Sequence, residues 1–189
     1  MTSPWATVRV DDLSFGVLDN GDIPIETADW SNGLVAVMSH GAVISTGIHI
    51  GYVRVRVDLT TSAPHEDDRS WEEVVEASVH APHGHLRVDS FEQGTVTTLP
   101  LLSAAGPGWY RLRVHARGRQ TNPDGVQNQP VEEYLLSIWP APPSPTTIRH
   151  GSDRIEASLR TTPPPPDTQP QPNPPPQEPA FKPAPFPKD

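Results

Sequence analysis

Apolar and polar side chains alternate through much of the first 139 residues. The segment 52–59 shows this most clearly, with valine or leucine at every odd position and tyrosine, arginine or aspartate at every even one. A period of two is typical of a strand with one buried face. The same reading predicts strands over residues 7–10, 13–17, 34–39, 42–50, 52–59, 71–80, 86–88, 95–102, 109–116 and 131–139.

About ten short strands joined by turn residues predict an all-β fold, which we interpret as an antiparallel, jelly-roll-like β-sandwich. Asn20-Gly21 and Asn32-Gly33 are typical turn pairs, because both residue types accept a positive φ at low cost. The segment 71–80 is ambiguous. Its three glutamates suit a helix, but its valines and the following Pro82 favour a strand with a bulge, which we adopt.

The chain changes character after Trp139, since 17 of its 25 prolines lie in the last 50 residues. Proline donates no backbone hydrogen bond and restricts the residue before it, and the region is poor in apolar side chains. We therefore expect a β-domain over residues 1–139 and a disordered proline-rich tail over residues 140–189. Within that tail, Asp153 as an N-cap with Glu156 three residues later predicts a short helix at 153–160.

Negative charge is concentrated in the predicted domain. Residues 1–139 carry 18 Asp and Glu against nine Arg, whereas the tail holds five acidic and five basic side chains. Binding to nucleic acid depends on Lys and Arg, so we expect no direct nucleic-acid partner. The charge permits a basic protein partner, and it equally suits a domain that is acidic only for solubility.

The chain has no cysteine, which is typical of a protein made for a reducing compartment. Its N-terminus lacks the pattern of a signal peptide, and no apolar stretch approaches the roughly 20 residues of a membrane span. We expect a cytoplasmic protein without a membrane partner.

Catalytic motifs are absent from the sequence. It contains no Gly-x-Ser-x-Gly elbow and no glycine-rich phosphate loop, and paired acids such as Glu132-Glu133 would point to opposite faces of a strand. We therefore assign no catalytic residue and no cofactor, and expect a protein that is not an enzyme.

One alternative is a small metal-dependent β-barrel enzyme that uses His80, His83 and His85. His83-x-His85 resembles the His-x-His of cupins, but a cupin has an acidic residue four or five positions later, and Glu92 is seven positions after His85. We favour solvated histidines beside a Gly-Pro turn and assign no metal ligand.

Acidic loops are the predicted contact surface. The loop 60–70 places three carboxylates next to Trp71, an arrangement typical of an aromatic anchor within a charged rim. In the alternative reading, Trp71 turns into the core. Together with the turn at 19–22, this predicts the following partner-binding residues: Asp19, Asp22, Glu66, Asp67, Asp68 and Trp71.

The order of elements over residues 13–139 resembles the bacterial competence nuclease-inhibitor (ComJ-like) family. The matching positions are Leu13-Ser14-Phe15, Asp29-Trp30, Gly41-Ala42-Val43-Ile44-Ser45, Val53-Arg54-Val55-Arg56 and Gly108-Trp109-Tyr110-Arg111-Leu112. The resemblance implies a protein that binds and silences a DNA-degrading enzyme, with acidic groups in place of the substrate's phosphates. No contact residue is transferred from that family.

The leading hypothesis is thus an acidic protein-binding module of the nuclease-inhibitor or immunity type, with a basic partner. The metal-dependent enzyme is one alternative, and a scaffold protein with a flexible tail is the other.

Overall fold

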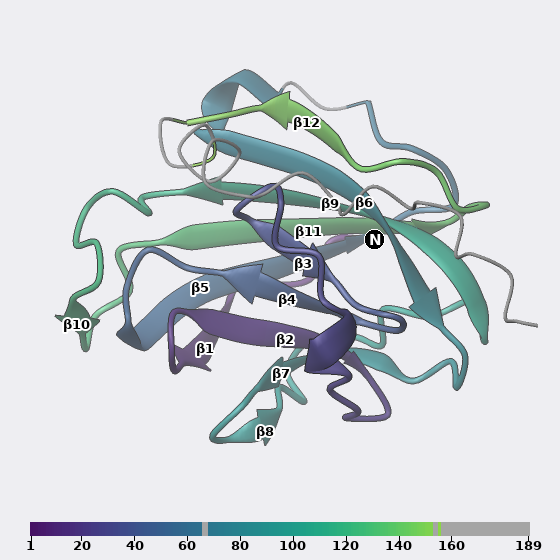
Figure 1. Cartoon of the computed structure of the whole chain (residues 1–189), viewed down its shortest axis with the longest axis horizontal. Coiled ribbons are helices and arrows are strands. Elements are labelled where there is room, and N and C mark those ends of the chain that lie inside the picture. Colours follow the sequence, from purple (N-terminus) through teal and green to yellow (C-terminus); the bar gives the residue numbers. More distant parts are fainter. Residues whose placement is uncertain (66–67, 153–154, 156–189) are drawn as a thin grey trace, which may run out of the picture.

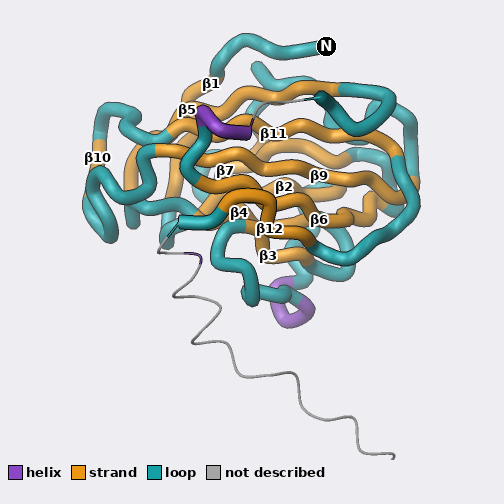
Figure 2. The backbone as a smooth tube through the Cα atoms, turned by 90° about the horizontal axis from the view of Figure 1, so that it is seen from above, coloured by secondary structure: helices purple, strands orange, loops and turns teal. Residues whose placement is uncertain are grey.

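The computed structural model describes residues 1–65, 68–152 and 155, which are nearly all strand and loop (Figure 1). Two short 3-10 turns interrupt them, η1 (Ile25–Thr27) and η2 (Asp68–Ser70). No helix in this part of the chain is long and apolar enough to cross a membrane. The strands form two sheets and run side by side in Figure 2, with β10 in a loop at one end.

The larger sheet has the order β1-β5-β11-β9-β6-β12, with β10 paired to β5. Its strands are β1 (Ala6–Val10), β5 (Ile50–Leu59), β6 (Glu73–Ala81), β9 (Gly108–Arg117), β10 (Val126–Gln127), β11 (Glu133–Pro140) and β12 (Thr147–His150). The pairings of β5 with β10 and with β11 are parallel, and the others are antiparallel.

The smaller sheet has the order β3-β4-β2-β7-β8 and is antiparallel along the described strands. Its strands are β2 (Ser14–Asp19), β3 (Val35–Val37), β4 (Ala42–Ser45), β7 (Leu86–Ser90) and β8 (Gly94–Thr95).

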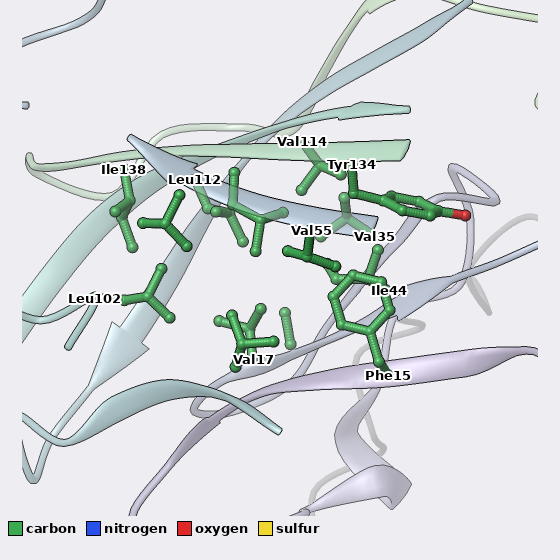
Figure 3. Close-up of a cluster of buried hydrophobic side chains, with 14 of the residues drawn as sticks. Phe15, Val17, Val35, Ile44, Val55, Leu102, Leu112, Val114, Tyr134 and Ile138 are labelled. Carbon is green, nitrogen blue, oxygen red and sulfur yellow. The ribbon is translucent and has the colours of Figure 1, made fainter. Parts of the chain in front are cut away.

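Alternate side chains of the strands point into one apolar interior, as predicted. On β5, Val53, Val55 and Val57 are fully buried. Both sheets contribute to the same cluster (Figure 3), in which the ring of Phe15 from β2 meets that of Tyr134 from β11 edge to face at 5.3 Å. Because each buried apolar side chain contributes about 1.5–3 kcal/mol, this shared interior is the main source of stability.

The strand predicted over residues 95–102 is wrong beyond its first residue, since β8 ends at Thr95. Apolar side chains at Val96, Leu99 and Leu102 pack against the core at a spacing of three rather than two. The backbone turns to allow this, with the Leu99 amide donating to the Val96 carbonyl at 3.0 Å. The ambiguous segment 71–80 does form a strand, β6.

Regular structure continues past the predicted boundary at residue 139. β12 pairs with the edge of β6, and Ile155 is buried in the main cluster. Between β11 and β12, the proline-rich stretch lies against β6 and β9 of the larger sheet. The Ser144 amide donates to Ser78 Oγ at 2.8 Å, and Arg111 Nη1 donates to the Ser144 carbonyl at 2.8 Å. Prolines can lie here because side chains satisfy the neighbouring backbone groups. The helix predicted at 153–160 lies outside the described residues except for Ile155, as does the tail from residue 156.

A buried polar network closes one end of the two sheets. Arg119, 1% exposed, donates to Glu73 and to the Gly33 carbonyl. Beside it, the buried Glu132 accepts hydrogen bonds from the backbone amides of residues 47 and 48 and from the Tyr134 hydroxyl. Burial raises the pKa of Tyr134 well above its usual value, and the nearby Glu132 raises it further. These groups fasten the loop 118–132 to the rest of the fold.

We expect Arg119→Met to lower the free energy of unfolding by about 3–5 kcal/mol, because it leaves the Glu73 carboxylate buried without its cation. The matched variant Arg54→Met removes a guanidinium that is 43% exposed and should cost about 1 kcal/mol or less. Urea unfolding of both variants measures the difference. Equal losses would contradict a stabilising role for the buried network.

Candidate functional site

Asp19 lies at the end of β2 and is fully buried, although we predicted it on the contact surface. Its two carboxylate oxygens accept hydrogen bonds from the backbone amides of His83 and His85, each at 2.6 Å. These amides flank Gly84, whose φ of +70° produces the turn between β6 and β7. Asp19 is therefore a clamp that fixes this turn. An acidic residue in a sequence turn can face inward when backbone amides satisfy it.

Asp22 is exposed, as predicted, and lies where two histidines meet. Its Oδ2 is 3.8 Å from His40 Nε2 and 3.7 Å from His83 Nε2. The turn before it uses Asn20 and Gly21 at positive φ, in agreement with the Asn-Gly signal. The turn thus holds one carboxylate of the predicted set on the surface.

Trp71 points inward, as in the alternative reading of the sequence. It is 8% exposed and packs with Val74 and Leu135 on the outer side of the larger sheet. Arg117 stacks over its ring with Cζ 4.8 Å from the centroid, and the His115 ring lies 5.5 Å away. Trp71 is therefore part of the packing and does not project toward a partner.

The three acidic residues predicted beside Trp71 cannot be placed as a group. Glu66 and Asp67 lie outside the described residues, and Asp68 begins η2. Their role in binding stays a prediction.

His80, His83 and His85 do not converge. The His80 ring stacks on Trp109 at 4.6 Å, His83 faces Asp22, and His85 lines a separate hollow beside Arg87. Within residues 1–65, 68–152 and 155, no three side chains of His, Asp or Glu gather as a metal site requires.

A surface loop that we did not predict as a contact region combines apolar and acidic groups. This loop, residues 20–33, joins β2 to β3 and contains η1. Ile23, Ile25 and Trp30 are 46%, 48% and 46% exposed. The loop also carries three exposed carboxylates, those of Asp22, Glu26 and Asp29. Large apolar side chains exposed together among charges are typical of a protein contact surface.

The 20–33 loop is fastened to the smaller sheet. Ala28 packs on the outer apolar cluster of Leu18, Ala36, Met38 and Val43, and Figure 1 shows η1 in front of the end of β2. The Asp29 amide donates to the Val37 carbonyl at 2.9 Å. The Ser39 amide donates to Thr27 Oγ1 at 2.8 Å.

The C-terminal end of the 20–33 loop is fixed by a buried asparagine. Asn32 Oδ1 accepts from the amides of Leu34 and Val35, and its Nδ2 donates to the Val35 carbonyl at 2.7 Å. Both ends of the loop and its centre are therefore bonded to strands. A loop held in this way loses little conformational entropy on binding.

Another hollow, of about 240 Å³, lies at one end of the fold and is almost entirely apolar. Of its lining residues, Tyr110 alone carries a titratable group, and its hydroxyl donates to the Gly106 carbonyl at 2.5 Å. Burial raises the pKa of Tyr110. The residues lining this hollow supply no pair of acid and base.

We expect Asp19→Asn to lower the free energy of unfolding by about 2–3 kcal/mol. The amide has one acceptor oxygen instead of two and carries no charge, so one backbone N–H group loses its acceptor and the other hydrogen bond becomes weaker. The neighbouring Asp22→Asn changes a side chain that is 52% exposed and should stay within about 0.5 kcal/mol of the parent. Urea unfolding tests both, and the amide shifts of His83 and His85 report the turn. An Asp19→Asn protein as stable as the parent would refute the clamp.

No protein-family model matches the chain, and neither does any curated protein. Among solved structures, a protein named "Crocagin biosynthetic gene J" is similar at 14% sequence identity. The alignment covers 75% of this chain and 98% of that chain, with a TM-score of 0.44. A similarity of this size does not bear on function.

Proposed function

We propose that this protein is a non-catalytic binding module, a jelly-roll-like β-sandwich that contacts a basic protein through its 20–33 loop. The observation that carries the proposal is the exposure of Ile23, Ile25 and Trp30 among carboxylates on a loop fixed by backbone hydrogen bonds. The sandwich architecture is supported by two sheets that share one apolar cluster.

The apolar side chains would supply most of the affinity. Trp is among the residues that most often dominate binding energy, and burying an aromatic anchor within a polar rim excludes water from its contacts. Trp30 keeps nearly half of its surface exposed although its loop is ordered by the Gly33 amide, which donates to the Trp30 carbonyl at 3.1 Å. The anchor is therefore available without prior rearrangement.

The carboxylates would determine specificity for the partner. Among the described residues, neither Glu26 nor Asp29 forms an ion pair. On the larger sheet, by contrast, four arginines pair with Glu76 or Glu133: Arg54, Arg111, Arg113 and Arg117. Unpaired negative charge beside an apolar anchor favours a basic partner surface and accelerates its association.

The resemblance to competence nuclease inhibitors makes a nuclease the partner that we propose. A nuclease cleft is basic because it binds phosphates, and the carboxylates of the 20–33 loop would occupy it in their place. The scaffold alternative depends on the tail, which from residue 156 onward lies outside the described residues.

Trp30→Ala should weaken the complex about 30-fold or more, since truncation of an aromatic hot spot costs about 2 kcal/mol. The test combines a panel of nucleases with calorimetric titration and assays of residual DNA cleavage. Val126→Ala removes another exposed apolar side chain, 65% exposed and on β10, and serves as the matched control. The affinity of the parent chain should fall as salt rises.

Two outcomes would overturn the proposal. If no nuclease binds, the partner class is wrong. If a complex forms and Trp30→Ala weakens it no more than Val126→Ala does, the 20–33 loop is not its contact surface. A photo-crosslinker can be placed at position 25 and, as a control, at position 126. If position 25 captures no protein that position 126 does not also capture, the 20–33 loop is not a contact surface for any partner.

A further inference from the structure

A second concave site lies on the smaller sheet, where β7 meets the start of the 20–33 loop. It measures about 300 Å³ and is lined by polar residues and one glycine: Asn20, Gly21, His85, Arg87, Asp89 and Thr95. His85, Arg87 and Asp89 occupy alternate positions of the chain, so their side chains point to the same side of the smaller sheet. The hollow is therefore built by a regular strand and is not a gap between loops.

Asp89 is the central group of this site. It is only 6% exposed, yet just one of its oxygens is bonded, Oδ1, which accepts from Thr95 Oγ1 at 2.7 Å. Burial raises the pKa of Asp89, and the Thr95 hydrogen bond and the charge of Arg87 offset this only in part. A desolvated carboxyl with spare acceptor capacity is costly unless a ligand or water completes its hydrogen bonds.

Arg87 supplies the complementary donors. Arg87 lines the same hollow, and its charge acts on Asp89, but its side chain forms no hydrogen bond to another described residue. His85 also lines the hollow, and its backbone amide is held by the Asp19 clamp. The site therefore offers acceptors and donors in one hollow, and with neutral histidine its formal charge is zero.

The geometry points to a binding site for a neutral polyhydroxylated ligand, a single sugar ring, whose neighbouring hydroxyls donate to Asp89 and accept from Arg87. Each hydroxyl is both donor and acceptor, so a pair of them satisfies the carboxylate and the guanidinium together. A hollow of about 300 Å³ lies at the lower end of the volumes of small-molecule sites, which suits a single ring. This inference goes beyond the proposed protein contact and does not depend on it.

Charged ligands fit less well. A phosphate or carboxylate would meet the Asp89 carboxyl in the same hollow as Arg87, and the like charges would repel. An ammonium group would likewise meet the Arg87 guanidinium, a like charge, in the same hollow. A neutral ligand leaves the charge balance between Arg87 and Asp89 intact.

The test is an NMR titration of the full, ¹⁵N-labelled chain with glucose, galactose and mannose, and separately with glycine and inorganic phosphate. At least one sugar should give saturable shifts at the amides of Arg87, Asp89 and Thr95. Arg87→Gln and Asp89→Asn should each weaken that binding about tenfold or more. Arg54→Gln, on the other sheet, should leave it unchanged. The spectrum of each variant also shows whether it is folded.

Three results would overturn the site. Sugars that produce no saturable shift up to their solubility would remove it. Sugar binding that survives both Arg87→Gln and Asp89→Asn would place the ligand elsewhere. Binding of glycine or phosphate without any sugar would replace it with a site for a zwitterion or an anion. A folded Trp30→Ala chain should bind the sugar as the parent does, so the outcome is separable from that for the protein partner.

Discussion

The surface of the smaller sheet depends on one buried carboxylate. Asp19 ends β2, accepts two backbone hydrogen bonds from the turn at 83–85 and immediately precedes the 20–33 loop. Charge-assisted bonds of 2.6 Å in a desolvated position are strong and directional. The same residue therefore sets where the loop leaves the sheet and where β7 begins. The proposed protein contact begins directly after Asp19, and the first two residues of that loop, Asn20 and Gly21, also line the polar hollow.

The two sheets use their charges differently. On the larger sheet, Glu76 joins Arg111 and Arg113. Burial alone would raise the pKa of Glu76, but hydrogen bonds from these arginines outweigh it and lower the pKa. Tryptophans lie under other guanidiniums, as Trp5 does beneath Arg54 at 4.9 Å. The cations of the domain are thus largely committed to structure on one sheet, and uncompensated carboxylates remain on the loop of the other.

Part of this arrangement follows from the sequence alone. The alternation at 52–59 identifies β5 and its buried valines, because strand period and burial are local properties. The inward turn of Trp71 was one of two readings of the sequence. That of Asp19 could not be predicted, since its partners lie 64 and 66 residues away. The 20–33 loop was not predicted as a contact surface, because its isoleucines follow neither the period of a strand nor that of a helix. Ile-Pro-Ile beside acids, in a turn-rich link with no strand of its own, is the signal that could have identified it. Asp89 resembles any solvated acid in the sequence, and only the fold shows that it is desolvated in a hollow.

The docking of β12 has a practical consequence for anyone who isolates the β-domain. Composition suggests cutting the chain after Trp139, but such a cut removes the strand that covers the outer edge of β6. An uncovered edge offers free backbone groups to other molecules and invites intermolecular pairing. It also removes two backbone acceptors of Arg111, the carbonyls of Ser144 and Pro145, and withdraws Ile155 from the interior. A soluble fragment should therefore end beyond Ile155, inside what looks by composition like a linker.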